Sequence, residues 1–250
     1  MALHGDLVEI SRHLCRSVDR LEFEPPVTHV YNPLAYARAP HESYLEFGRT
    51  GIEALLVGMN PGPFGMVQTG VPFGEIEMVR NWLGISGVVE RPSREHPKRP
   101  IQGFDCLRHE VSGKRLWGWA QDRFKNPQAF FDRFFVWNYC PLAFLEVSGR
   151  NRTPDKLLPV ERETLYRICD ESLAKVIGTL KPVRVLGVGA FALQRVRKVL
   201  EQFPEQTRES GKDPVQTGSI LHPSPASPVA NRGWAPQAEK QLTELGVPLD

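Results

Sequence analysis

The stretch Glu53–Gly65, EALLVGMNPGPFG, joins a short apolar run to a turn rich in glycine and proline. The apolar run, Glu53–Met59, has the composition of a strand that is buried on both faces of a parallel sheet. Two prolines within four residues stiffen the turn, here named the Asn60 loop (residues 60–65). The pattern therefore predicts a buried strand with the side chain of Asn60 held beside its end.

Three further apolar runs have the same character, and helical patterns separate them. The runs are Arg133–Asn138, Val183–Val188 and Thr217–Leu221. The helical patterns are an opening segment with Leu7, Ile10, Leu14, Val18 and Leu21 on one face before Pro25 and Pro26, then Thr164–Leu180, Ala190–Phe203 and a last helix from Trp234 to Gly246. Strands that alternate with helices predict an α/β layered domain with a parallel sheet. The segment Tyr31–Arg49, rich in proline and aromatic residues, is expected to be an ordered loop.

Length and composition fit one such domain. The chain has 250 residues, 41% hydrophobic and 24% charged, which is enough apolar content to bury a sizeable core. No repeat or low-complexity linker divides it, so residues 1–250 are expected to form a single domain, with residues 1–30 as an N-terminal helical segment. The net charge is only +2, so binding to a polyanion would need local clusters of basic residues.

One such cluster lies in Glu90–Pro100, ERPSREHPKRP, a charged segment broken by prolines. It is predicted to be a surface loop. Its basic residues are Arg91, Arg94, Lys98 and Arg99. Two interpretations stay open: a solvated loop, or a loop that contacts phosphates.

The four cysteines point to no metal centre. Cys15, Cys106, Cys140 and Cys169 form no C-x-x-C pair and have no histidine cluster, so buried reduced thiols are expected and a zinc site is not. An iron–sulfur cluster from four distant cysteines stays possible, without a local signature. The sequence shows neither a signal peptide nor the ~20 apolar residues of a membrane span, so an intracellular protein without membrane contact is expected.

Polar side chains follow three of the four predicted strands. Ligands of open parallel sheets bind beyond the carboxyl ends of the strands, where Asn60, Asn138 and His222 come together in this prediction. Cys140 is the one nucleophile nearby. The Asn60 loop matches neither a Walker A loop nor a dinucleotide-binding loop. A turn-capping role for Asn60 and a structural role for His222 stay open as alternatives.

The last strand is followed by His222–Trp234, HPSPASPVANRGW, here named the His222 loop. Its prolines and small residues make it stiff, it has no acidic residue, and Arg232 is its one arginine. It is either a plain surface loop or a wedge that enters a DNA duplex.

Four motifs together resemble the single-strand-selective monofunctional uracil-DNA glycosylases, within the uracil-DNA glycosylase superfamily. They are GMNPGPFGMVQTGVPFGE (Gly58–Glu75), NYCPL (Asn138–Leu142), SGRNRTP (Ser148–Pro154) and HPSPASPVANRGW (His222–Trp234). The resemblance covers the chain from about Tyr31 to its end. It implies an α/β/α sandwich around a four-stranded parallel sheet, in agreement with the strand pattern.

The resemblance also implies an activity. Uracil, and related bases such as 5-hydroxymethyluracil or xanthine, would be flipped out of single- or double-stranded DNA and removed by hydrolysis of the N-glycosidic bond, leaving an abasic site. DNA is then the partner, and no metal or cofactor and a monomeric state are expected. A DNA-repair enzyme would lie in the nucleus of a eukaryote, or in the cytoplasm at the nucleoid of a bacterium.

Roles follow by motif. Asn60 resembles the residue that positions the attacking water, His222 the donor to uracil O2, and Asn138 the amide that reads O4 and N3–H. Phe73 resembles the ring that stacks on the base. Met59, Gly62 and Met66 resemble pocket walls. The implied DNA contacts are Pro223, Ser224, Pro225, Ala226, Ser227 and Arg232. Animal members often have arginine where this chain has Ala226, which puts family-typical grip on the product in doubt.

Two other function classes remain open from the sequence. One is a nucleic-acid-binding protein without catalysis, and the other is a hydrolase of free nucleosides or nucleotides. The wedge-like His222 loop argues against the second, because a free nucleotide needs no wedge.

Overall fold

A computed structural model describes residues 2–207 and 213–249. Within these residues, four parallel strands form a sheet in the order β3-β2-β6-β7. The strands are β2 (Ala54–Gly58), β3 (Phe134–Asn138), β6 (Arg184–Val188) and β7 (Gln216–Ile220). Their bounds differ from those of the four predicted runs by at most one residue at each end. The predicted α/β fold with a four-stranded parallel sheet is confirmed.

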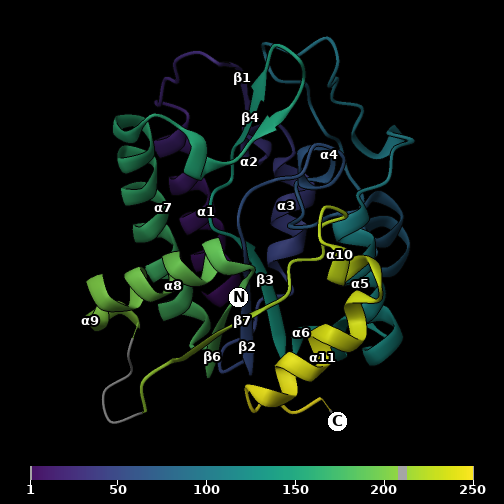
Figure 1. Ribbon diagram of the computed structural model, residues 1–250, viewed down its shortest axis with the longest axis vertical. Coiled ribbons are helices and arrows are strands. Elements are labelled where there is room, and N and C mark those ends of the chain that lie inside the picture. The colour runs from purple at the N-terminus through teal and green to yellow at the C-terminus, as the bar shows by residue number, and fades with distance from the viewer. Residues whose placement is uncertain (1, 208–212, 250) are drawn as a thin grey trace.

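Helices cover both faces of this sheet, which makes the three layers of the sandwich (Figure 1). The helices α1, α7 and α8 lie on one side, and α5, α10 and α11 lie on the other. The helices are α1 (Ala2–Val18), α2 (Pro33–Tyr36), α3 (Arg38–Leu45), α4 (Met66–Thr69), α5 (Val111–Phe124), α6 (Pro127–Phe131), α7 (Pro159–Leu180), α8 (Ala190–Gln202), α9 (Pro204–Thr207), α10 (Pro228–Asn231) and α11 (Trp234–Glu244). Shorter turns are a π-helical turn (Met78–Trp82) and two 3-10 turns (Gly103–Asp105, Pro154–Lys156).

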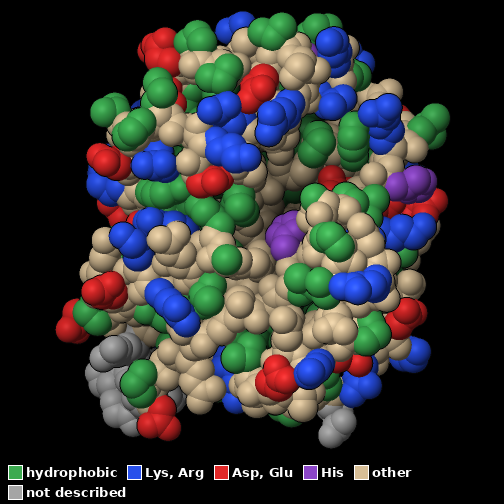
Figure 2. Space-filling model, in the orientation of Figure 1, with side chains coloured by type: hydrophobic (Ala, Val, Ile, Leu, Met, Phe, Trp, Pro, Cys, Tyr) green, Lys and Arg blue, Asp and Glu red, His purple; other side chains and the backbone are tan. Residues whose placement is uncertain are grey.

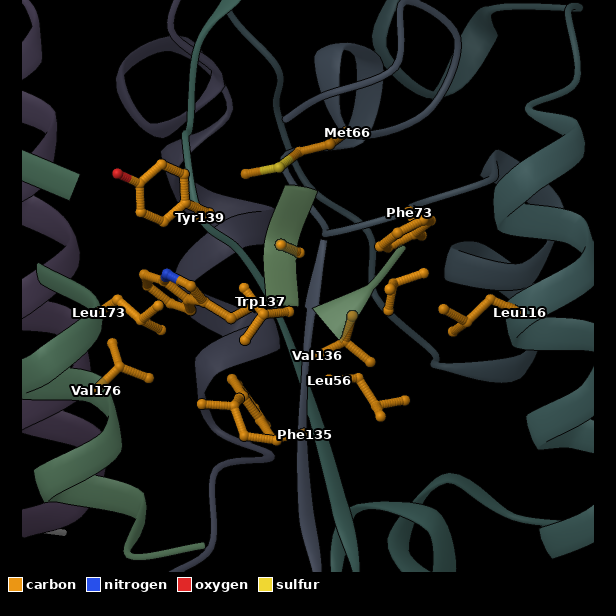
Figure 3. Packing of buried hydrophobic residues seen from close by; sticks show 14 of the residues in the cluster. Leu56, Met66, Phe73, Leu116, Phe135, Val136, Trp137, Tyr139, Leu173 and Val176 are labelled. Atoms are coloured by element: carbon orange, nitrogen blue, oxygen red, sulfur yellow. The ribbon is translucent and has the colours of Figure 1, made fainter. Parts of the chain in front are cut away.

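The central strands are apolar on both faces because helices cover both. All five residues of β2 and of β3 are buried. Side chains alternate along β3, so Phe135 and Trp137 point toward α7 while Val136 points toward α5 (Figure 3). Met66 and Phe73 lie beyond the strand ends in the same view. The core therefore reaches the edge where the candidate polar residues lie.

Two predictions about the first fifth of the chain need correction. Tyr31–Arg49 is mostly helical, because Asn32 caps α2 by accepting a hydrogen bond from the Leu34 N–H at 3.2 Å, and α3 follows directly. The opening helix ends at Val18, so Leu21 lies outside it. A proline-rich composition hid the short helices, because proline is favoured in a first helical turn.

A second, three-stranded antiparallel sheet was not predicted. It has the order β1-β4-β5. Its strands are β1 (Val27–Tyr31), β4 (Ala143–Glu146) and β5 (Asn151–Arg152). Strand β4 begins five residues after β3 ends, so the chain passes directly from the edge of the parallel sheet into this second sheet. Helix α5 was not predicted as an element either. The described residues include no helix with both the length and the apolar character needed to cross a bilayer.

A buried polar network lies next to the C-terminal end of β3 in the parallel sheet. The Tyr139 hydroxyl donates to Asp170 Oδ1 at 2.8 Å, and Arg195 forms an ion pair with the same carboxylate. The Arg195 guanidinium also lies 4.3 Å from the centroid of the Tyr166 ring. Burial raises the pKa of the Asp170 carboxyl, so its charge depends on these partners. Tyr139 directly follows Asn138, so the network anchors the end of β3.

Removing one partner of this network should destabilise the fold. Arg195→Met leaves the Asp170 carboxylate buried without its counter-ion, so we expect a loss of about 3–5 kcal/mol in the free energy of unfolding at neutral pH. Urea denaturation followed by circular dichroism measures it. The control is Arg197→Met on an exposed position of the same helix, expected to change stability by less than about 0.5 kcal/mol. Equal stability of the two variants would contradict the assigned role of the ion pair.

Candidate active site

The parallel register brings the ends of β2 and β3 level with each other, because Gly58 pairs with Asn138. A Cβ atom at Gly58 would lie 2.4 Å from Asn138 Oδ1 and 2.6 Å from Phe73 Cε2. Only glycine therefore allows the amide and the ring to meet over the strand end. Figure 2 shows a hollow in the middle of this face of the molecule, with a histidine at its edge.

Asn138 is the most deeply buried polar side chain of the site, with 5% of its surface exposed. Its Nδ2 lies 3.1 Å from the sulfur of Met66, a weak acceptor. Its Oδ1 is buried and has no hydrogen-bond partner among the described residues. An unsatisfied buried carbonyl costs ~1–3 kcal/mol, so this amide is arranged for a ligand that supplies the missing donor.

Phe73 adopts a left-handed backbone conformation with φ of +53°, which is uncommon for an aromatic residue. Its neighbours hold it there: Trp117 Nε1 donates to the Pro72 carbonyl at 3.2 Å, and Gly113 lets the backbone of α5 approach the Phe73 carbonyl. The ring is buried at the hollow, and its centroid lies 6.0 Å from that of His222. Backbone strain of this kind is retained where a side chain must be aimed.

His222 follows β7 and is fixed as one tautomer. Its Nδ1 accepts a hydrogen bond from the Ser224 N–H at 3.1 Å, so the neutral ring has its proton on Nε2. Burial lowers the pKa of the imidazole. A neutral ring with a single free N–H donor is therefore presented at the hollow.

The Asn60 loop is held by three segments of the chain. Asn60 Nδ2 donates to the Leu142 carbonyl at 3.2 Å, and Asn151 Nδ2 donates to the Pro61 carbonyl at 2.9 Å. The Met59 carbonyl accepts from the Cys140 N–H at 2.9 Å. In the described part of the chain, no hydrogen bond engages Asn60 Oδ1, which leaves an acceptor for a water molecule. Asn60 does not cap its own turn, because its side-chain amide donates to the carbonyl of Leu142, which lies far away in the sequence.

The half-buried carboxylate of Glu110 packs against this loop, and the sequence did not indicate it. Glu110 Oε2 lies where a Cβ of Gly62 would be, at 2.4 Å, and the Glu110 side chain also packs against Gly65. Burial raises the pKa of this carboxyl, while N–H groups of Phe64 and Ser112 bonded to it act in the opposite direction. Gly62 therefore gives room to Glu110, a contact between residues 48 positions apart (110 minus 62) that no local pattern reveals.

The His222 loop has a second support that the sequence did not indicate. Arg115 of α5 donates to the carbonyls of Pro223 (3.0 Å) and Ser224 (3.3 Å) and to Asn231 Oδ1 (2.8 Å). Pro223 is buried, while Pro225 and Ala226 are exposed. The His222 loop is thus held by Arg115 at Pro223 and Ser224, while its tip at Pro225 and Ala226 is exposed to solvent.

The remaining two predicted DNA contacts lie further along the same loop. Ser227 caps α10, because its hydroxyl accepts from the Ala230 N–H at 3.2 Å. Arg232 is exposed at the C-terminal end of α10. Asn138, Phe73, Met66 and His222 thus come together at the hollow, whereas Arg232 contacts none of these four side chains in the described structure.

Among the described residues, one group of side chains could hold a metal ion. Ligand atoms of Glu75, Glu77 and His109 lie within 4.8 Å of one another. Glu75 already bonds His109 Nδ1 at 2.8 Å and caps the Met78 N–H at 3.0 Å. The four cysteines, all within the described residues, form no disulfide, are buried as expected, and do not belong to this group.

Comparison with known proteins shows which sequences this chain resembles. No family model matched the sequence. The rat (Rattus norvegicus) single-strand selective monofunctional uracil-DNA glycosylase is 47% identical over 247 residues, which is 98% of this chain and 86% of the relative. The mouse (Mus musculus) protein of the same name is 46% identical with the same coverage. The cattle (Bos taurus) protein is 46% identical over 229 residues, 91% of this chain and 81% of the relative.

The fold has a solved counterpart. The crystal structure of wild-type SMUG2 from Pedobacter heparinus matches with a TM-score of 0.65 over 95% of this chain and 97% of that chain, at 17% identity. At this identity the likeness shows the fold alone, and it agrees with the sandwich described above. The relatives that share nearly half of the residues over almost the whole chain decide the family. The chain belongs to the single-strand selective monofunctional uracil-DNA glycosylases.

Proposed function

We propose that this protein removes uracil from DNA in base excision repair, by hydrolysing the N-glycosidic bond of a nucleotide flipped out of the strand. The observation that carries this proposal is the Oδ1 of Asn138 beside the Phe73 ring, which is buried and has no hydrogen-bond partner among the residues that the structure describes. A flat base with both a donor and an acceptor on one edge would satisfy that amide and stack on that ring. Uracil has such an edge in N3–H and O4.

Contacts in the pocket offset the free energy that is lost when the base is extruded from the DNA. Unstacking and unpairing cost a few kcal/mol, less for mismatched or unpaired bases. Stacking on an aromatic ring returns ~1–3 kcal/mol. Cytosine has an amine where uracil has O4, so one fixed amide orientation at Asn138 separates the two bases by the cost of an unpaired group. Met66 and the backbone of Met59 and Gly62 form the walls in this proposal.

Cleavage depends on stabilising the charges that develop on the sugar and on the base as the bond breaks. The sugar becomes oxocarbenium-like, as in glycoside hydrolysis, and the leaving uracil takes up negative charge on O2 and N1. The Nε2–H of neutral His222 would donate to O2, and a positioned donor of this kind is worth ~2.7–4 kcal/mol. Asn60 Oδ1 would orient the attacking water without removing its proton, because an amide is not basic. Bond breaking therefore precedes attack by water.

The reaction ends at an abasic site. Schiff-base lyase chemistry needs an amine nucleophile, and no lysine lies among the residues assigned to this pocket. The tip of the His222 loop would fill the gap left by the base, with the small Ala226 and nearby Pro225 and Ser224 there. We propose that residues 1–250 act as one monomeric domain on single- and double-stranded DNA, in the nucleus of a eukaryote or at the nucleoid of a bacterium. Related bases such as 5-hydroxymethyluracil and xanthine would enter the same pocket.

Asn60→Ala should abolish most cleavage while DNA binding stays intact, because the variant loses the water acceptor and not the pocket. We expect the single-turnover rate on a uracil-containing oligonucleotide to fall at least about 10²-fold, the usual effect of a misplaced reactant. Abasic product is measured after alkaline cleavage, and the dissociation constant by fluorescence anisotropy. A wild-type rate would remove the role for Asn60 and favour a binding protein without catalysis.

His222→Ala should lower the single-turnover rate by about 10²–10³-fold with little change in DNA affinity, because the donor acts on developing charge. The pH profile gives an independent check. Burial lowers the pKa of His222, so the neutral donor persists at neutral pH and is lost only as pH falls below the ordinary value of 6.5. The wild-type rate should therefore be flat from about pH 8 to 6.5; a titration centred at or above 6.5 that disappears in the variant would argue against a neutral donor.

Asn138→Asp should change base choice, because a carboxylate cannot donate to O4. We expect the ratio of uracil to cytosine excision to fall about 10- to 100-fold, the range set by one unpaired buried group. The assay is a pair of oligonucleotides that differ only in that base. Free uridine serves as a further substrate, since cleavage of uridine as fast as of DNA would select the nucleoside-hydrolase alternative. An unchanged ratio would exclude Asn138 as the reader of the base.

A further inference from the structure

A compact group of basic side chains lies next to the Asn60 loop, outside the pocket described above. It consists of Lys98, Arg99 and Arg108 and is named here the basic rim. The guanidinium carbons of Arg99 and Arg108 lie 5.3 and 4.9 Å from the centroid of the Phe64 ring, which belongs to the Asn60 loop. Lys98 and Arg108 are exposed, and Arg99 is half-buried. Arg99 and Arg108 thus bring positive charge to one ring of the Asn60 loop, which lies 35 or more positions earlier in the sequence (99 minus 64).

No acidic side chain within the described part of the chain neutralises the charge of the basic rim. In residues 2–207 and 213–249, none of the three side chains takes part in an ion pair. Arg99 Nε is buried without a hydrogen-bond partner. Glu95, one of the two acidic residues of the same loop, already accepts from the Ile101 N–H at 2.7 Å. Two guanidinium groups held at one ring repel each other, so an anion bound between them would relieve that repulsion.

The loop that carries Lys98 and Arg99 is rigid. The buried His96 donates its N–H to the Tyr31 hydroxyl at 2.6 Å, and that hydroxyl donates to the Arg99 carbonyl at 2.7 Å. Gln68 of α4 donates to the Pro100 carbonyl at 3.2 Å. A second Gln68 contact, 3.3 Å to a carbonyl of the Asn60 loop, ties the two loops together. The basic rim is therefore held in place relative to the site, and little ordering is needed before it binds.

The position of the rim indicates what it binds. Lys and Arg side chains lie above the hollow in Figure 2, and the basic rim itself lies against Phe64 of the Asn60 loop. A DNA strand whose nucleotide enters the hollow must continue across an edge of the hollow. Arginine forks match phosphate oxygens, and such contacts position the nucleic acid without reading its sequence. The net charge of +2 for the whole chain makes a local group of three unpaired cations stand out.

We propose that the basic rim binds the backbone phosphates of the lesion-bearing DNA strand next to the flipped nucleotide. This rests on the proposed glycosylase function. It selects the phosphate-contacting interpretation of Glu90–Pro100 over the solvated one, and adds Arg108 from outside that segment. Because the lesion strand is present in both substrates, the rim acts on single-stranded and duplex DNA alike.

The test is the double variant Lys98→Gln/Arg108→Gln, in which both changed side chains are exposed and the fold is preserved. Dissociation constants for a uracil-containing oligonucleotide are measured between about 50 and 200 mM salt. We expect weaker binding at low salt by about tenfold or more, and a slope of log Kd against log salt that is smaller by roughly 1.4 for single strands, since each phosphate contact contributes about 0.7. The single-turnover rate at saturating enzyme should stay at the wild-type value.

The matched control is Arg16→Gln/Lys175→Gln, which removes the same charge from exposed positions on α1 and α7. It should change neither the slope nor the rate. A rim variant with the slope of this control would overturn the proposal, as would a loss confined to duplex DNA or a loss that persists as a slower rate at saturation. Lack of uracil excision by the wild-type protein would instead refute the proposed function, so the two failures are distinguishable.

Discussion

The site depends on the missing side chain of Gly58. The parallel register places Gly58 level with Asn138, and the space over Gly58 is taken by the Asn138 amide and the Phe73 ring. Any Cβ there would collide with both. The two groups that would recognise a base, one by hydrogen bonds and one by stacking, are therefore brought together by strand pairing and by one glycine. The rest of the site is arranged around this contact.

Rigid supports surround this contact, and most of them come from elsewhere in the chain. Helix α5 is the main one, since Glu110 precedes it, Trp117 fixes the turn before Phe73, and Arg115 clamps the His222 loop. On the other side, the Tyr139–Asp170 hydrogen bond anchors the end of β3. The positive φ of Phe73 and the unsatisfied carbonyl of Asn138 are both unfavourable in the absence of a ligand. Several independent supports are therefore needed to hold them in place.

The parts of the molecule that could be predicted from the sequence are those with local signals. The apolar run before Asn60 and its three counterparts identified the parallel sheet, and the edge rule then grouped Asn60, Asn138 and His222. The short helices after Tyr31 were missed because a proline-rich composition shows no helical period. The second sheet was missed because its strands, of two to five residues and mixed polarity, give no clear pattern. Glu110 and Arg115 were missed for another reason: they support loops 48 and 108 positions away in the chain, a distance at which single-sequence patterns carry no information.

Electrostatics divides the site into a neutral centre and a charged border. At the centre, amides and a histidine kept neutral by burial would act on the base, where a full charge would have to be desolvated before any base could bind. At the border, Arg99 and Arg108 lie beside Phe64 and form no ion pair with any other residue that the structure describes. This separation suits a polyanion that carries a neutral base, because the backbone would be held by charge and the base selected by geometry. Phe64 links the two zones, since its ring lies under the arginines while its backbone belongs to the loop that presents Asn60. Phosphate bound at the border would thus hold the strand beside this rigid loop and leave the arrangement of the centre unchanged.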